Sequence, residues 1–294
     1  MEISAKDVMK LRQMTGAGMM DCKKALAESN GSLDEAVDFL RKKGLKTAEK
    51  RADREANEGK VVCLLADDGR AGVLLELNSE TDFVAGTPDF RAFALDCAAQ
   101  ALAKRPADVE ALLDLPAVQN PAIKLADQLS DMVGKLGEKM GVRRFCVLAI
   151  PAGRQGKVHT YIHLGDKHGV IIAVACDKPA SVVAPAFQEL VNDLALQVVA
   201  YTPKGVDRDS IDPAVVEHEL NLYREMIRAE GKPEQMVDKI AQGKLNKFYA
   251  ESTLLEQAFL KEEKSTVHQV VDQLGKQLDD KVVVESFAAF IIGQ

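Results

Sequence analysis

The sequence predicts an α+β protein, in which a small helical domain precedes a two-part core of antiparallel sheets and helices. Two observations favour this fold class. Apolar residues in the first 45 positions recur at helical spacing, and residues 59–106 resemble residues 156–203 without a gap. The chain of 294 residues is also longer than the commonest single domain, so two or three compact units are expected.

Residues 1–45 are expected to form three short helices. Ser4 and Ser32 stand at expected helix N-caps, each followed three positions later by an acidic residue. A TGAG run separates the first two helices, and Gly44 is expected to end the third. Residues 46–58 carry charge on all sides and are expected to form a solvent-exposed helical linker.

The core is expected to consist of two related halves. Twelve of 48 positions are identical when 59–106 is placed on 156–203. Each copy has the pattern of a strand, a tight turn, a strand and a long helix, and a further helix and third strand follow downstream. The sequence therefore predicts two small antiparallel sheets backed by helices. The first half is 59–150, and the second is made of 151–204 and 247–294.

An insertion of about 40 residues interrupts the second half. Residues 205–246 show the pattern of two helices that turn at the sequence EGKP, which predicts an inserted αα-hairpin. Such an arm could join two copies of the chain, as a homodimer or a two-plus-two complex. It could also pack on its own core or touch a partner.

The loop after the second strand differs between the two copies. Thr81, Asp82, Phe83 and Val84 align with the sequence KPAS at 178–181. One interpretation is structural, with an acid at a helix N-cap and an aromatic ring in the core. The second copy, however, makes the same connection with other residues. The alternative is therefore a loop specialised for function, since a phenyl ring outside a core usually meets another surface.

Charge and composition narrow the classes of function. The net charge is −7, and residues 1–58 hold 12 Lys/Arg and 11 Asp/Glu, so the remainder carries −8. Such an acidic body is a poor direct ligand for nucleic acid. Neither a long apolar run nor an apolar leader is visible, so we expect no membrane association and a cytoplasmic location. Five widely spaced cysteines fit reduced thiols.

No covalent chemistry is expected. Cys146 with His159, His163 and His168 could suggest a metal site or a nucleophile, but their spacing across a strand and turn would split them between faces. We therefore expect neither a metal nor a cofactor. No phosphate-binding G-x-x-x-x-G-K-[ST] run is present, so the chain itself is not expected to hydrolyse nucleotides.

Two stretches of the chain carry a resemblance to a known family. The sequence LRQMTGAGMMDCKKALAESNGSLDEAVDFLRKKG, followed by NSETDFVA, is similar to translation elongation factor Ts, and GKPEQMVDKIAQGKLNKF resembles that family's helical hairpin. The resemblance covers nearly the whole chain. It implies a ubiquitin-associated-like fold for the N-terminal domain. It also implies guanine-nucleotide exchange on the GTPase elongation factor Tu, which the chain would bind in nucleotide-free and GDP forms.

The resemblance also implies which residues meet the partner. In the exchange loop Thr81–Val84, Asp82 and Phe83 would lie beside the partner's magnesium and phosphates. The further implied contacts are Arg12, Met19, Met20 and Lys23 in the N-terminal domain, and Leu136, Gly137, His163 and Leu260 in the core. From the residues alone, the two methionines would also fit as core filler.

One departure from the family stands beside the loop, where Ser79 and Glu80 replace a Cys-Gln pair. Two other function classes stay open from the residues alone. A binding adaptor would recruit a protein without any effect on nucleotide. A small-molecule enzyme would need paired acids, and the repeat offers none at matching positions.

Overall fold

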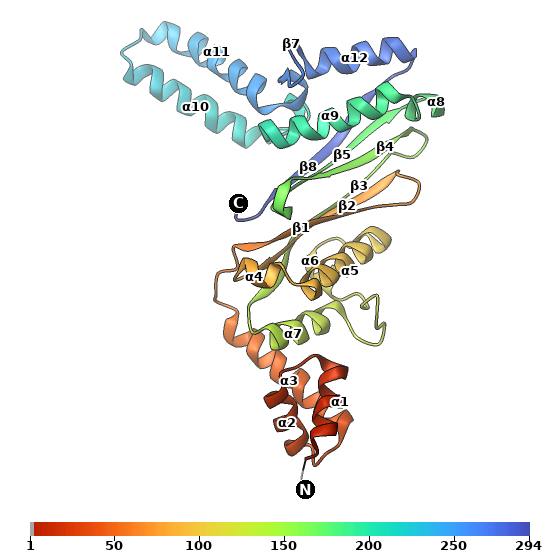
Figure 1. Ribbon diagram of the computed structural model, residues 1–294. Helices are drawn as coiled ribbons and strands as arrows, with labels where there is room; N and C mark the ends of the chain where they lie inside the picture. The colour runs from red at the N-terminus through yellow and green to blue at the C-terminus, as the bar shows by residue number, and fades with distance from the viewer. Residues whose placement is uncertain (1–2) are drawn as a thin grey trace.

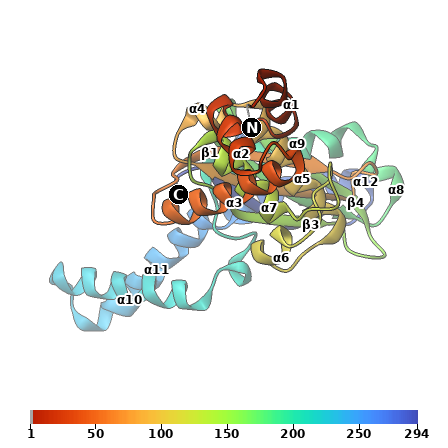
Figure 2. The ribbon, with the colours of Figure 1, turned by 90° about the horizontal axis from the view of Figure 1, so that it is seen from below.

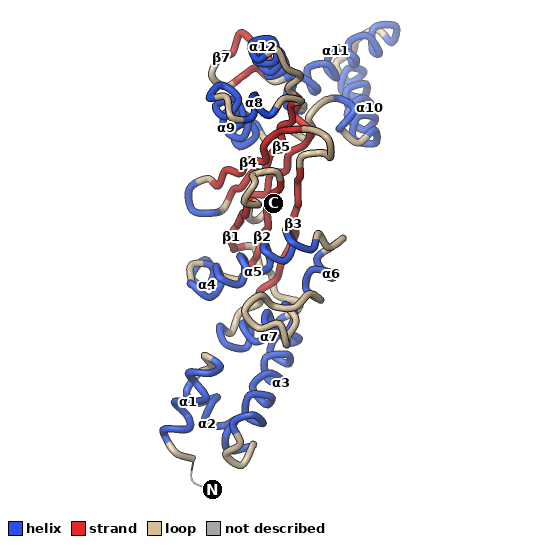
Figure 3. The backbone as a smooth tube through the Cα atoms, turned by 90° about the vertical axis from the view of Figure 1, so that its right-hand side faces the viewer, coloured by secondary structure: helices blue, strands red, loops and turns tan. Residues whose placement is uncertain are grey.

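The computed structural model describes residues 3–294 and shows an elongated molecule (Figures 1 and 3). The N-terminal helices lie at one end and a projecting helical hairpin at the other. Between them, two small sheets are stacked in the middle, with helices outside each sheet. The structure is thus mixed helix and sheet, as predicted.

Three helices form the N-terminal domain: α1 (Ala5–Thr15), α2 (Met19–Glu28) and α3 (Leu33–Arg51). The hydroxyl of Ser4 accepts a hydrogen bond from the N–H of Asp7, and that of Ser32 accepts one from the N–H of Glu35. Both predicted N-caps are therefore confirmed. The helices enclose a separate small core of Val8, Leu11, Cys22, Ala25, Leu26 and Ala36.

The prediction that Gly44 ends the third helix is wrong. α3 continues to Arg51, and Gly44 lies within it against Gly134 of α7 (Leu125–Leu136). A Cβ atom added to Gly134 would lie 2.8 Å from Cα of Gly44, and one added to Gly44 would lie 2.8 Å from the carbonyl oxygen of Ser130. The missing side chains let two helix backbones touch. The N-terminal domain is therefore docked directly on the first half of the core.

We expect Gly134→Ala to weaken this docking by about 1–3 kcal/mol, because the new methyl group must push α3 away. Hydrogen–deuterium exchange should then become faster in α3 and α7. The matched control is Gly243→Ala, since Gly243 lies in α11 (Glu234–Ser252) with open space around it. That variant should leave both helices protected. Unchanged exchange for Gly134→Ala would contradict a tight crossing.

The core holds two three-stranded antiparallel sheets. The strand orders are β1-β2-β3 and β4-β5-β8, with bounds β1 Glu58–Leu65, β2 Ala71–Ser79, β3 Met140–Ala149, β4 Gln155–Ile162, β5 His168–Cys176 and β8 Val283–Ile291. The sheets face each other across a shared cluster that includes Leu74, Ile171 and Phe290.

Helices cover the outer face of each sheet: α5 (Pro88–Lys104), α6 (Val109–Leu113) and α7 on the first, and α9 (Pro185–Tyr201) and α12 (Val267–Leu278) on the second. The central strand β2 is consequently buried on both faces. Its Val73, Leu75 and Leu77 pack toward the helices, and Leu74 packs toward the other sheet. This explains why the strand is a nearly continuous apolar run.

The first four elements of the first half have counterparts in the second half at a constant offset in sequence. β4, β5, α8 (Pro179–Val182) and α9 begin and end 97 residues after β1, β2, α4 (Asp82–Ala85) and α5. The register irregularity that follows Glu76 in the first sheet follows Ala173 in the second. The interval equals the one at which the sequence resembles itself.

The predicted insertion contains α10 (Pro213–Ala229) and most of α11, which project from the body as an antiparallel pair (Figure 2). α11 extends past the predicted boundary at 246 to Ser252, because Leu245 and Phe248 pack with Ile211 at the base of the hairpin. A small β6–β7 pair (Ala258–Phe259, Glu262–Thr266) was not predicted. Across residues 3–294, every helix is too short or too polar to cross a membrane.

Candidate partner-binding site

The predicted exchange loop is one helical turn, α4, at the end of β2. Thr81 is its N-cap, and Oγ1 of Thr81 accepts a hydrogen bond from the N–H of Val84 at 3.4 Å. Six residues later Thr87 caps α5 in the same way. Asp82 therefore follows the cap and leaves its carboxylate free of that role.

Exposure within the turn separates the two interpretations of the loop. Phe83 is 85% exposed and Asp82 is exposed beside it, so the interpretation of a core aromatic is wrong. The resemblance also implies a contact for Val84, which is only 9% exposed and lies in the core of the first half. That contact stays a prediction. Val84 anchors the turn, which presents an acid and a phenyl ring to solvent.

Glu138 holds the turn from the side. One of its carboxylate oxygens accepts the N–H of Thr81 at 3.0 Å, and the other accepts the hydroxyl of Thr81 at 2.8 Å. The hydroxyl of Ser79 donates to the carbonyl of Thr81 at 2.8 Å. Sequence reasoning missed Glu138. Its signal was its position after Gly137, which ends α7 in the left-handed conformation.

Glu80 connects the same region to the end of the N-terminal domain. Its carboxylate accepts Nη1 of Arg51 at 2.6 Å, Nη1 of Arg54 at 2.9 Å and the N–H of Lys139 at 2.6 Å. Partial burial alone would raise the pKa of Glu80, but the bonds from Lys139, Arg54 and Arg51 outweigh it and lower the pKa to about 2. Two arginines thus neutralise the charge of Glu80.

Because the pKa of Glu80 falls from 4.5 to about 2 on folding, its ionised form stabilises the fold above pH 4.5, and this contribution is lost as the pH falls toward 2. Glu80→Gln lacks the contribution. The unfolding free energies of wild type and variant should therefore approach each other by about 1 kcal/mol between about pH 6 and about pH 3.5, after discounting for solvent screening. Urea unfolding at both pH values measures this, and a constant difference would contradict it.

The predicted N-terminal contacts lie on the surface of α1 and α2. Arg12 and Lys23 are exposed, and so are Met19 and Met20, at 53% and 76%. The core-filler interpretation of the two methionines is therefore wrong. Of two further exposed methionines on α1, Met9 lies beside Arg12 and Met19 and extends this apolar surface, whereas Met14 lies beside Val37 and Leu40 of α3. Methionine side chains are flexible and adapt readily to a partner's shape.

The predicted core contacts fall into two groups. Leu136 and Gly137 are partly exposed at the end of α7, immediately before Glu138 and thus beside the α4 turn. His163 is exposed at the turn between β4 and β5. Leu260 is 40% exposed between β6 and β7, at the opposite end of the core from α4 (Figure 1).

The turn that carries His163 is tied to the first half. Its Asp166 pairs with Lys60 at 2.8 Å and with Arg91 at 3.2 Å. These ion pairs join β1 and α5 to the second half, so the two halves are fixed to each other near the candidate site.

Comparison with known proteins gives one consistent family. A family profile described as "Elongation factor TS" matches residues 80–294. The protein named elongation factor Ts in Chlorobaculum parvum is 45% identical over 295 residues, covering 99% of this chain and 99% of that protein. The one in Trichlorobacter lovleyi is 40% identical over 294 residues, covering 100% of this chain and 94% of that protein. The chain therefore belongs to the elongation factor Ts family.

Proposed function

We propose that this protein is a guanine-nucleotide exchange factor in the cytoplasm. It binds elongation factor Tu, promotes release of GDP by disturbing the magnesium and phosphate site, and so allows GTP to load during translation elongation. The observation that carries the proposal is the α4 turn. The family membership names the partner, and the turn presents an exposed phenyl ring and an exposed carboxylate from a buried anchor.

An exchange factor of this kind works through linkage of binding equilibria. It binds the nucleotide-free partner more tightly than the loaded partner, and reciprocity then weakens nucleotide binding by the same factor. In this mechanism Phe83 wedges into the partner, and Asp82 perturbs the magnesium electrostatically so that the phosphates are held less tightly. No covalent step is required.

Several surfaces have to act together. Accelerating release by four decades lowers the barrier by roughly 5.5 kcal/mol, whereas burying one Phe supplies about 1.5–3 kcal/mol. The methionine surface of α1 and α2 is the second contact in our proposal, and the second half supplies the rest. The helix contact at Gly44 and Gly134 supports this scheme, because it fixes the first surface relative to α4 before binding.

We infer that the core arose by duplication and that only the first copy was specialised. The constant interval of 97 residues between matching elements supports this. At the position of α4, the second half has α8, which begins with Pro179 and presents Ala180 in place of an aromatic. The small separate core of α1–α3 fits a ubiquitin-associated-like domain at 1–45, followed by the segment 46–58.

The hairpin is our candidate for a contact between chains. Val215, Leu222 and Met226 are exposed apolar residues of α10 spaced seven and four positions apart, and so share one side of that helix. They could meet elongation factor Tu or a second copy. We propose no direct contact with nucleic acid or membrane.

The test is release of a fluorescent GDP from elongation factor Tu, with and without this protein. We expect a large acceleration, together with tighter binding to the nucleotide-free partner than to the GDP form. Equal affinity for both forms, with no acceleration, would instead support the adaptor.

A further inference from the structure

We propose that Glu138 is a positioning residue for exchange, acting on Asp82 and Phe83 through Thr81. The inference rests on the proposed function and deepens it. Glu138 itself need not touch elongation factor Tu. Its role is to fix, before the partner arrives, the turn from which the acid and the ring project.

The hydrogen bonds at Thr81 give the first reason. A hydroxyl has a single proton, and the geometry lets Thr81 donate that proton to Glu138 while a lone pair accepts the N–H of Val84. The second oxygen of Glu138 accepts the N–H of Thr81. Glu138 thereby orients the cap of α4 and the strand end before it. Bonds to an ionised carboxylate are stronger than neutral ones.

The location of Glu138 gives the second reason. It follows α7, the helix against which α3 packs at Gly134, and the next residue, Lys139, donates its N–H to Glu80. The segment that follows α7 thus holds two successive residues, Glu80 and Thr81, and Thr81 is the first residue of the exchange loop. Through it, the turn that presents Phe83 and the domain that presents the methionine surface share one support.

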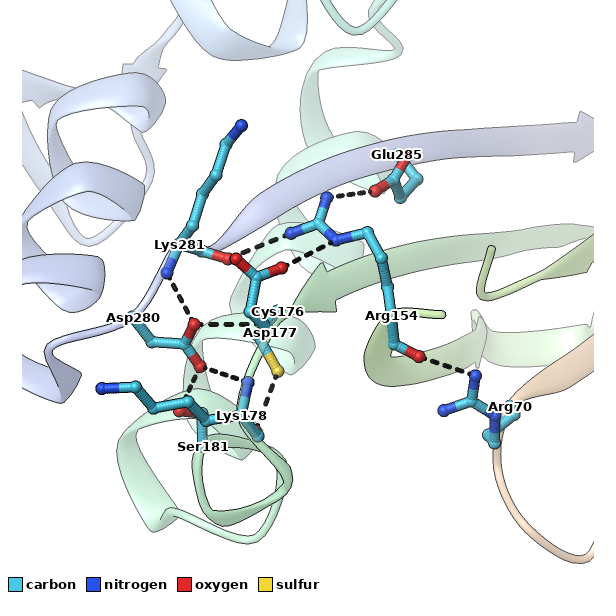
Figure 4. A network of polar contacts seen from close by, with 9 residues as sticks. All are labelled: Arg70, Arg154, Cys176, Asp177, Lys178, Ser181, Asp280, Lys281 and Glu285. Carbon is cyan, nitrogen blue, oxygen red and sulfur yellow. Dashed lines mark hydrogen bonds and ion pairs between the residues drawn. The ribbon is translucent and has the colours of Figure 1, made fainter. Parts of the chain in front are cut away.

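The second half has a corresponding acid that holds a corresponding turn, but this turn carries no aromatic ring. Asp280 follows the left-handed Asp279 at the end of α12, in the place where Glu138 follows Gly137. Its carboxylate accepts the N–H groups of Asp177 and Lys178 at 3.0 and 2.9 Å, and the hydroxyl of Ser181 (Figure 4). Lys178 aligns with Thr81, so an acid holds the corresponding turn in both halves. The second half supplies a natural control.

The test compares Glu138→Gln with Asp280→Asn in the release of fluorescent GDP from elongation factor Tu. Without the oriented cap, the turn must be ordered on binding, so Glu138→Gln should slow release about ten-fold. Asp280→Asn should change it less than about two-fold, because its turn presents no ring. Hydrogen exchange of the Val84 amide in the free protein should become faster in Glu138→Gln alone.

A double-variant cycle separates positioning from general destabilisation. Once Phe83→Ala has removed the ring, Glu138→Gln should slow release little further, since there is less left to position. A ten-fold loss in both backgrounds would overturn the proposal, as would equal losses for Glu138→Gln and Asp280→Asn.

Two further outcomes distinguish this inference from the proposed function. If Glu138→Gln releases GDP from elongation factor Tu as fast as wild type while Phe83→Ala releases it slowly, the inference fails and the proposed function stands. If wild type itself gives no acceleration, the proposed function fails and the inference fails with it.

Discussion

Phe83→Ala should slow the release of GDP from elongation factor Tu by ten-fold or more at an equal concentration of this protein. The ring is 85% exposed in the free molecule, so its burial against a partner is worth about 1.5–3 kcal/mol. That energy corresponds to a factor of roughly ten to one hundred in rate. Stopped-flow fluorescence of labelled GDP measures the effect.

The stability of the free protein should not change, because the ring of Phe83 is mostly surrounded by solvent. Val183→Ala is the matched control, since Val183 is an exposed apolar residue directly after α8, at 77%. It should leave both exchange and melting temperature as in wild type. If Phe83→Ala still released GDP rapidly, the proposed exchange function would stand, but the proposed insertion of Phe83 into the partner would be refuted.

Arg144→Ser should lower the free energy of unfolding by about 3 kcal/mol, the largest loss of stability that we expect from a single substitution. The carboxylate of Glu76 lies between the two sheets with 0% exposure and accepts Nε of Arg144 at 2.7 Å. The same guanidinium lies 4.5 Å from the ring centre of Phe290 in the second sheet. Removing it leaves a buried charge, with Arg143 at 3.8 Å as its nearest cation. Urea denaturation measures the loss.

The second sheet suggests the control. At the equivalent register position it pairs Ala173 with Ser286, where the first pairs Glu76 with Arg144. The double variant Glu76→Ala/Arg144→Ser installs that neutral pair and removes the stranded charge, so it should recover most of the lost stability. A double variant only as stable as Arg144→Ser would show instead that the arginine acts through its packing.

Local signals predicted most of the elements. Serine and threonine caps and the apolar periodicity placed the helices, and the self-similarity of the chain predicted both sheets. The error at Gly44 has a tertiary cause. A glycine late in a helical pattern is a common helix end, but here it is needed for contact with Gly134 of α7, 90 positions away. No local pattern contains that information.

The sequence likewise predicted some features of the candidate site and not others. The exposure of Asp82 and Phe83 agrees with the contrast between the two copies, because a loop that differs where the scaffold repeats is free to serve another purpose. The burial of Val84 and the bonds from Glu138 could not be predicted. They depend on which side of a single helical turn faces the core, and on a residue 57 positions further along the chain.

The two ends of the hairpin arm meet at its base. The N–H of Lys204 donates to the carbonyl of Ser252 at 2.7 Å, and Gly205 bridges to Thr253, so the arm leaves and rejoins the body at nearly one point. Because the ends of the arm already meet, its length adds little to the entropic cost of bringing the flanking segments together. A change in the length of the arm should therefore leave the register of the sheet beneath it unchanged.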